Sequence, residues 1–359
     1  MKPKVIAFYL PQYHPIKENN EWFGEGFTEW TNVGNAKPLF KGHYQPRVPA
    51  DLGYYDLRLA EVREKQVTLA KEAGVYGFCY WHYWFGNGKR LLNRIWDEVI
   101  DNGKPDFPLC LGWANHSWYA KNWDNRQKDK IIVEQTYPGE EDYKNHFNLA
   151  LKAFKDSRYI KIKGKPLFFI FDALSVPKDF FLTWNKLAQE NGFQNGLCFI
   201  GRVLKNKDIE KAFELGYNYV TVERVYGIFE KQSKLKIRIF KLKNLLLRRN
   251  KNCIDYSLAY KKFIDKDYDT RNDVIPMIIP NWDHSPRSKG RNIILHNSTP
   301  QLFAKHIKKV LDLIKKKDPE DQIIFLKSWN EWGEGNYLEP DLKYGKEYIK
   351  TLRRELESK

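Results

Sequence analysis

No uninterrupted apolar stretch in this 359-residue sequence reaches the roughly 18 residues that a membrane-spanning helix needs. The first apolar run is short, ends at Pro11 and precedes no small-residue cleavage pattern, so we interpret it as a strand and not as a signal peptide. Cysteine is scarce as well: the four thiols form no CxxC pair, and three of them lie inside apolar runs. These absences predict a cytoplasmic protein with reduced thiols.

Motifs that bind nucleotides and metals are also missing. No GxGxxG or GxxxxGK[ST] motif follows an apolar run, and the eight histidines form neither HExxH nor a Cys/His cluster. His82, His116 and His284 could still converge, although hydrogen bonding or substrate contact is the more ordinary role for such side chains. The sequence therefore predicts no metal and no cofactor.

What the chain does contain is a regular alternation of short apolar runs and longer amphipathic stretches. The runs predict eight buried strands, at Val5–Leu10, Val75–Tyr80, Phe107–Trp113, Pro166–Phe171, Gly196–Gly201, Tyr217–Val222, Val274–Pro280 and Ile323–Trp329. The stretches predict helices over Asp56–Ala73, Arg90–Asn102, Glu141–Lys155, Lys178–Asn191, Lys207–Leu215 and Thr299–Lys317. This alternation favours an α/β fold of one domain over residues 1–359, a (β/α)8 TIM barrel, with an open doubly wound sheet as the alternative.

Two segments interrupt the alternation. Asn19–Tyr55 follows the first strand and is too long for an idle connection, so we expect a functional loop there. Glu230–Lys262 lies between strands six and seven and reads as an insertion. From Lys231 to Lys262 there are eleven Lys and Arg residues against one acid, so this segment holds ten of the sixteen net positive charges.

In a barrel, function lies where the strands end and the loops begin. Aromatic rings interleaved with amides, acids and imidazoles follow most of the predicted strands, and that mixture suits a carbohydrate, whose apolar faces stack on rings while its hydroxyls need donors and acceptors. Alternatively, the rings simply fill the barrel mouth. The predicted substrate-binding residues are Tyr9, Trp30, Trp81, His82, Tyr83, Trp113, Asn115, Trp118, Trp282, Asp283, Arg287, Trp329, Asn330 and Trp332.

The sharpest local signal is the pair Glu331 and Glu334, just past the last apolar run. Two close carboxylates resist double ionisation, so one can act as an acid while the other stays a base, and glycoside cleavage uses such a pair. Loop acids that stabilise a following helix are the alternative.

Seven segments resemble a known family: FYLPQYHPI (8–16), EWFGEGFTEWTNV (21–33), GHYQPRVPADLGYYDLR (42–58), GFCYWHYWFGNGKRLL (77–92), LGWANHSW (111–118), NWDHSPR (281–287) and SWNEWGEGNYLEPD (328–341). They resemble the WbsX-like proteins of bacterial surface-polysaccharide gene clusters, from about Val5 to Tyr348. The same chain is similar to glycoside hydrolase family 99, the endo-α-mannosidases and endo-α-mannanases, through the turn Asn330–Gly335.

That resemblance implies a (β/α)8 barrel in which Glu331 is the base and Glu334 the general acid. It also implies a retaining route: the base takes the proton of the sugar 2-hydroxyl, a 1,2-anhydro sugar forms, and water then opens it. The hydrolases commonly carry a bulkier residue where this chain has Gly333.

Residues 231–251 combine nine cations with interleaved aliphatic residues and no acid. Part of this segment could form a basic amphipathic helix on an anionic membrane surface, which would place the protein at the inner face of the membrane. A solvated charged hairpin is the alternative. No nucleic-acid-binding motif accompanies the charge, so we expect no nucleic acid partner.

Together with what the resemblance implies, these observations predict a retaining endo-type glycoside hydrolase acting on α-linked, manno- or rhamno-configured bacterial polysaccharide or lipid-linked glycan, such as O-antigen or capsule. Two alternatives stay open: a glycosyltransferase or transglycosylase, and a barrel that binds glycan without turnover.

Overall fold

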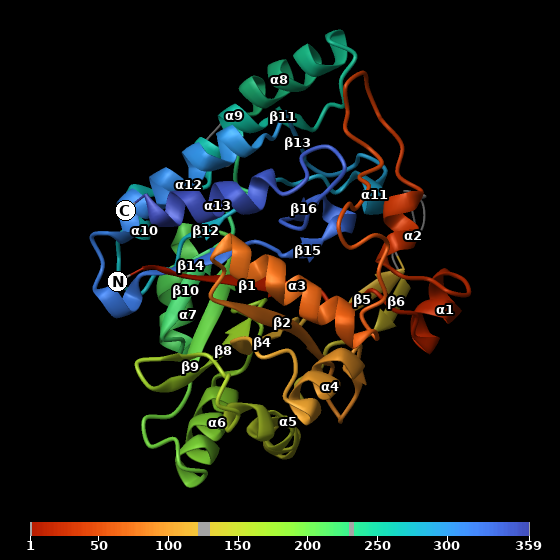
Figure 1. Cartoon of the computed structure of the whole chain (residues 1–359). Helices are drawn as coiled ribbons and strands as arrows, with labels where there is room; N and C mark the ends of the chain where they lie inside the picture. Colours follow the sequence, from red (N-terminus) through yellow and green to blue (C-terminus); the bar gives the residue numbers. More distant parts are fainter. Residues whose placement is uncertain (1, 121–129, 230–232, 359) are drawn as a thin grey trace.

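The computed structural model describes residues 2–120, 130–229 and 233–358. Residues 230–232, at the start of the predicted insertion, lie outside this part. Eight parallel strands form the central sheet, in the spatial order β10, β9, β8, β4, β2, β1, β14, β12 (Figure 1). In chain order these are β1 (Lys4–Tyr9), β2 (Gly77–Trp84), β4 (Leu109–Trp113), β8 (Lys165–Ile170), β9 (Cys198–Val203), β10 (Tyr219–Val222), β12 (Met277–Ile278) and β14 (Ile323–Leu326).

The sheet closes on itself between β10 and the chain that enters β12. Val220 donates its N–H to Asp273 O at 2.9 Å, and Ile275 donates its N–H to Val220 O at 2.7 Å. Every strand of the ring then has two neighbours, and helices lie between successive strands on the outside. The predicted (β/α)8 barrel is confirmed.

The outer layer consists mainly of α3 (Ala60–Ala73), α4 (Arg94–Asn102), α5 (Glu140–Phe154), α6 (Lys178–Glu190), α7 (Ile209–Leu215), α12 (Pro300–Ile314) and α13 (Glu347–Glu357). The sequence prediction missed α13, which packs against α12 and α3. It also began two helices four residues too early, since α3 starts at Ala60 and not at Asp56. Arg90–Leu91 form a short strand, β3, paired with Tyr83 and Trp84 at the end of β2, so α4 starts only at Arg94.

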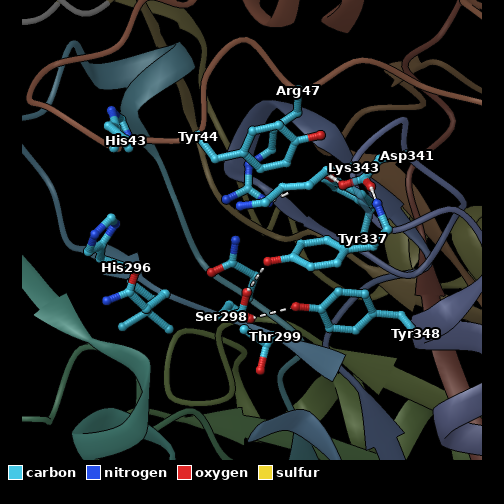
Figure 2. Close-up of a pocket in the computed structure, with 15 residues that line it drawn as sticks. His43, Tyr44, Arg47, His296, Ser298, Thr299, Tyr337, Asp341, Lys343 and Tyr348 are labelled. Carbon is cyan, nitrogen blue, oxygen red and sulfur yellow. Dashed lines mark hydrogen bonds between the residues drawn. The ribbon is translucent and has the colours of Figure 1, made fainter. Parts of the chain in front are cut away.

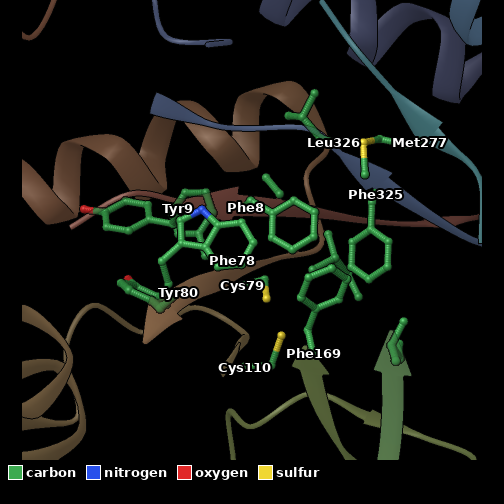
Figure 3. Close-up of a cluster of buried hydrophobic side chains, with 14 of the residues drawn as sticks. Phe8, Tyr9, Phe78, Cys79, Tyr80, Cys110, Phe169, Met277, Phe325 and Leu326 are labelled. Atoms are coloured by element: carbon green, nitrogen blue, oxygen red, sulfur yellow. The ribbon is translucent and has the colours of Figure 1, made fainter. Parts of the chain in front are cut away.

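The barrel interior is filled by aromatic rings from strands that are not neighbours (Figure 3). Phe8 of β1 contacts Phe169 of β8 with ring centroids 4.6 Å apart, although β2 and β4 separate these strands in the sheet. Phe325 of β14 contacts both rings, at 5.0 and 5.3 Å. Such contacts are reached only across the interior, so the barrel is a packed core whose chemistry must sit at its ends.

The long loop after β1 contains α1 (Lys17–Phe23) and α2 (Glu29–Gly34). Thr28 caps α2 by accepting a hydrogen bond from Trp30 N–H, while the side chain of Thr31 bonds back to Thr28 N–H. This reciprocal cap fixes the first turn of α2. As a result Glu29, the first residue of the helix, is held in a buried position near the barrel mouth.

The insertion between β10 and β12 contains α8 (Lys234–Leu246), β11 (Cys253–Asp255), α9 (Tyr256–Ala259) and α10 (Lys266–Asp269). β11 pairs in parallel with β13 (Ile294–His296), which belongs to the next loop together with α11 (Ser285–Ser288). The basic helix α8 lies at the outer edge of the molecule, as Figure 1 shows. None of the helices in the described ranges combines the length and apolar content needed to cross a bilayer.

Five further short strands belong to the loops: β5 (Trp118–Ala120) pairs with β6 (Lys130–Val133), β7 (Lys161–Ile162) pairs with β8, and β15 (Asn330–Glu331) pairs with β16 (Asn336–Tyr337). The β15–β16 hairpin carries both predicted catalytic glutamates at its tip. Short 3₁₀ turns complete the connections.

Candidate active site

A cavity of about 810 Å³ opens at the carboxyl ends of the barrel strands. Its walls come from the long loop after β1, the β5–β6 hairpin, the loop that contains α11, and the turn after β14. Of the predicted residues, eight line it: Trp81, Tyr83, Asn115, Trp118, Trp282, Arg287, Glu331 and Glu334. The cavity therefore unites both glutamates with aromatic rings and hydrogen-bonding side chains, as a saccharide site requires.

The two glutamates converge on one guanidinium group. Arg287 Nη1 donates to Glu331 Oε1 at 3.1 Å and to Glu334 Oε1 at 2.7 Å. Since both oxygens bind the same nitrogen, they lie at most about 6 Å apart, which is closer than the roughly 6.5–9.5 Å of inverting glycosidases. His284 Nε2 lies 3.4 Å from Glu334 Oε1 on another side.

The surroundings give the two carboxyl groups very different pKa values. Burial, and then the charge of Glu334, raise the pKa of Glu331 to about 7, against the opposing effect of Arg287. Burial also acts to raise the pKa of Glu334, but Arg287 and then His284 outweigh it and lower this pKa to about 2. In the free site the pair therefore shares a single proton near neutrality, and Glu331 holds it.

Glu29 anchors Arg287 from behind. Arg287 Nη2 and Nε donate to Glu29 Oε2 at 2.8 and 3.0 Å. This pair occupies the space beside Gly333: a Cβ at that position would overlap Glu29 Oε2 and lie 3.0 Å from Arg287 Nε. The absence of a side chain at position 333 therefore leaves room for the ion pair of Glu29 and Arg287 beside the two acids.

A second ion cluster forms the floor of the cavity. Glu223, at the end of β10, is fully buried and lies 2.8 Å from both Lys327 Nζ and Arg202 Nη1. Burial acts to raise the pKa of Glu223, but Lys327 and then Arg202 outweigh it and lower the pKa. Arg202 also lies over the Phe171 ring at 3.6 Å. These charges are paired in the free protein, which leaves the aromatic surface above them for an uncharged ring.

Four predicted residues lie outside the cavity and hold the turn that carries Glu331 and Glu334. Asn330 accepts from Leu10 N–H at 2.8 Å, and Trp332 donates from Nε1 to Glu339 Oε2 at 2.7 Å. Asp283 donates its N–H to Glu334 O at 2.6 Å. Trp329 is buried against Phe78, with ring centroids 5.5 Å apart. Their predicted contact with the sugar is not supported, because none of the four lines the cavity.

The other four lie farther from it. Tyr9 donates its hydroxyl to Gln66 of α3 at 2.7 Å, and Trp30 donates from Nε1 to Tyr55 O at 2.7 Å. His82 Nε2 lies 2.9 Å from His146 Nε2 of α5, and Trp113 donates from Nε1 to Trp84 O at 2.8 Å. Alternate residues of a strand face opposite sides, so Tyr9, His82 and Trp113 point outward into the helix layer instead of toward the substrate.

The sequence prediction of site residues omitted Glu29, Glu223, Tyr226, His284 and Lys327, which all line the cavity. Glu223 and His284 follow predicted strands six and seven, so the strand-end rule was enough to find them. Glu29 lies more than 250 residues from the turn it supports, and no local signal marks it. Within the described ranges, no group of three or more His, Cys, Asp or Glu side chains is placed to hold a metal ion.

Comparison with known proteins agrees with this architecture. The sequence profile of the family described as "Glycosyltransferase WbsX" matches residues 5–352. The uncharacterized protein WxcX of Xanthomonas campestris pv. campestris (strain ATCC 33913) is 31% identical over 362 residues, covering 98% of this chain and 49% of the relative. WxcX of strain B100 is also 31% identical, over 361 residues with the same coverage of each chain. The chain thus spans about half the length of the curated relatives it matches.

Solved structures share the fold at low identity. A glycoside hydrolase-like protein matches with a TM-score of 0.63 and 16% identity, over 99% of this chain and 94% of the other. The GH99 endo-alpha-mannosidase from Bacteroides thetaiotaomicron matches with a TM-score of 0.56 and 14% identity, over 99% and 96%. With the profile match across nearly the whole sequence, the chain belongs to the WbsX glycosyltransferase family, built on the barrel that GH99 enzymes share.

Proposed function

We propose that this protein is a retaining endo-type glycoside hydrolase of α-linked, manno- or rhamno-configured bacterial surface polysaccharide. The observation that carries the proposal is the partly buried pair Glu331 and Glu334, bridged by Arg287 in the wall of an aromatic cavity. Their close spacing suits a retaining outcome. The volume of about 810 Å³ accommodates several sugar units, which favours cleavage within a chain.

In the proposed route, the carboxylate of Glu331 takes the proton of the sugar 2-hydroxyl, and O2 attacks C1. The bond from C1 to the leaving oxygen breaks as Glu334 gives that oxygen a proton, and a 1,2-anhydro sugar remains. Glu334, now ionised, accepts a proton from water as the water attacks C1, and Glu331 returns its proton to O2. The raised pKa of Glu331 suits the base.

This assignment requires the shared proton to move. In the free site Glu331 holds it, because Arg287 and His284 keep Glu334 ionised. A leaving oxygen seated against Glu334 would displace Arg287 Nη1 from it, and losing that contact raises the pKa of Glu334. Substrate binding thereby transfers the proton to the carboxyl that must donate it.

Transfer to a glycan acceptor is the second candidate function, favoured by the family description. A transglycosylase differs only in that a sugar hydroxyl replaces water. Transfer from a nucleotide sugar has less support. The two Asp-x-Asp triplets, at residues 265–269, serve the fold: Asp265 caps α10, and Asp269 accepts from Arg224 at 2.9 Å.

One experiment separates these functions. The protein is incubated with the source organism's own polysaccharide, with and without nucleotide sugars, and chain length is followed by electrophoresis. Shortening without a donor supports hydrolysis, and redistribution to longer and shorter chains supports transglycosylation. Lengthening only with a donor contradicts the proposal. No change in length, with binding retained, indicates a barrel that binds glycan without turnover and also contradicts it.

We further propose that α8 contacts an anionic membrane surface. Leu235, Ile239, Leu242 and Leu246 recur at helical spacing and are 58–77% exposed, while Phe240 on the opposite face packs against Phe229. The exposed aliphatic stripe is flanked by cations: Lys234, Lys236, Arg238, Lys241, Lys243, Arg248 and Arg249. An apolar face bordered by cations is the pattern of a helix lying in a lipid interface.

Vesicle sedimentation tests this contact. The protein should bind vesicles of phosphatidylserine and phosphatidylcholine, and the bound fraction should fall as salt rises, since each cation contributes roughly 1 kcal/mol near an anionic surface. Replacing Lys241, Lys243, Arg248 and Arg249 by Ser should abolish binding. Equal binding by that variant, or by wild type to phosphatidylcholine alone, would show that α8 is not the contact. Replacing Lys289, Lys305, Lys308 and Lys315 by Ser is the charge-matched control.

A further inference from the structure

A second pocket, of about 250 Å³, lies behind the catalytic turn and is separate from the cavity described above. Figure 2 shows it, with Tyr44, Arg47 and Lys343 gathered on one side and His296 and Ser298 on the other. Its size suits one sugar ring. None of the residues that line it takes part in the proposed mechanism.

The two hollows share a wall. Asn281 lines the second pocket and Trp282 lines the catalytic cavity, and the next residue, Asp283, is fully buried. Asp283 donates its N–H to Glu334 O at 2.6 Å, and its carboxylate accepts from His43, a residue of the second pocket, at 2.8 Å. A ligand in the second pocket would therefore lie next to Asp283, or be separated from it only by His43, and Asp283 holds Glu334 in place.

The charges of this pocket leave a cation without a partner. Lys343, whose side chain is exposed, lies over the rings of Tyr44 and Tyr344 at 4.6 and 5.0 Å, and no ion pair joins it to a carboxylate of the described ranges. The acid in the wall, Asp341, is already engaged by Tyr337, whose hydroxyl donates to it at 2.6 Å. Thr299, the N-cap of the 15-residue helix α12, adds the positive end of a helix dipole.

An acceptor is also left without a partner. Asn281 is buried, with 6% of its surface exposed, and its side-chain oxygen has no hydrogen-bond partner among the described residues. A buried amide oxygen is ordinarily satisfied. A ligand that completes this pocket must therefore bring a hydroxyl donor for Asn281, an anionic group for Lys343, and an apolar face for the tyrosine rings.

From these requirements we infer that the second pocket binds an acidic saccharide unit, a hexuronate, with its carboxylate on Lys343 and a hydroxyl on Asn281. A sugar acid carries both groups on one ring, and the ring face packs against Tyr44 or Tyr344. The inference deepens the proposed function, because it makes the substrate an acidic glycan that the protein grips at a second point behind the catalytic turn.

Ligand-observed NMR with the 359-residue chain tests this pocket without any turnover. D-glucuronate or D-galacturonate should bind saturably, with D-glucose and inorganic phosphate each at least about tenfold weaker. Lys343→Gln should weaken uronate binding about tenfold, as should Asn281→Ala. Lys309→Gln, which removes another exposed lysine lying over a tyrosine ring, should leave binding unchanged. So should Trp118→Ala, which alters only the catalytic cavity.

The outcomes separate the two proposals. Uronate binding that depends on Lys343 in a protein that cleaves no glycan would support this pocket and overturn the hydrolase. Cleavage of polysaccharide by a protein that binds no uronate would do the reverse. Phosphate binding as tightly as uronate, or uronate binding that Trp118→Ala abolishes and Lys343→Gln does not change, would each contradict an acidic-sugar site here.

Discussion

Arg287 donates a 2.7 Å hydrogen bond to Glu334 and, through the same nitrogen, a 3.1 Å hydrogen bond to Glu331. A cation between two carboxylates stabilises their ionised forms. Because the two hydrogen bonds differ in length, Arg287 stabilises the ionised form of Glu334 more than that of Glu331. Glu334, on the shorter bond and beside His284, stays ionised, whereas Glu331 takes the proton that the pair retains. This asymmetry makes the two glutamates experimentally distinguishable.

The first prediction concerns their roles. Glu331→Gln and Glu334→Gln should each lower turnover of natural polysaccharide by at least about 100-fold, since acid and base each contribute roughly 10²–10⁴. A glycosyl fluoride of matching configuration needs no protonation of its leaving group. Glu334→Gln should therefore retain most of the initial rate on the fluoride, while Glu331→Gln should not. The opposite pattern would exchange the two roles, and unchanged turnover in both variants would remove the pair from catalysis.

The second prediction is a pH dependence. The proposed reaction needs one proton on the pair, and this proton is lost near the pKa of about 7 of Glu331 in the free site. Accordingly kcat/KM should stay level between about pH 5 and 7 and fall tenfold per unit above it. Arg287→Met removes the cation that lowers both carboxyl pKa values, so the fall should start at higher pH. A profile that rises through pH 7 would refute the shared proton.

The third prediction concerns Gly333, which lies between the two acids in the sequence. Gly333→Ala places a methyl group where Glu29 now meets Arg287, so the ion pair must shift. We expect a loss of about 1–3 kcal/mol in unfolding free energy, typical of overpacking, and at least a tenfold fall in kcat/KM. Gly34→Ala, at the last residue of α2 with open space around it, is the control and should change neither quantity. Wild-type behaviour of Gly333→Ala would mean that Glu29 and Arg287 move freely.

The fourth prediction separates a substrate contact from a structural ring. Trp118 lines the cavity and is partly exposed, so Trp118→Ala should weaken glycan binding about tenfold or more with little change in stability. Trp113 is buried outside the barrel and donates to Trp84 O at 2.8 Å. Trp113→Phe should cost about 1–3 kcal/mol of stability through the orphaned carbonyl and leave binding intact. Calorimetric titration and thermal unfolding measure the two effects, and equal effects on binding would contradict the assignment.

The residues at the strand ends show which cavity-lining residues the sequence was able to predict. It identified the glutamates, Arg287 and five of the aromatic and amide residues that line the cavity. It failed where it treated every residue at a strand end alike. On β2, Trp81 and Tyr83 face the cavity, whereas His82 lies against His146 in the helix layer. The two-residue period of a strand separates these faces, so the information was present but unused.

The sequence alone determined the class of fold. In a closed parallel barrel, eight apolar runs separated by amphipathic stretches can pair all their backbone hydrogen-bonding groups and bury their apolar side chains at the same time. It also singled out the candidate catalytic pair, because both acids lie on one short turn. The tertiary structure decided what surrounds that pair. Glu29, Arg287 and Glu331 come from three distant loops, and only closure of the barrel brings their charges within hydrogen-bonding distance.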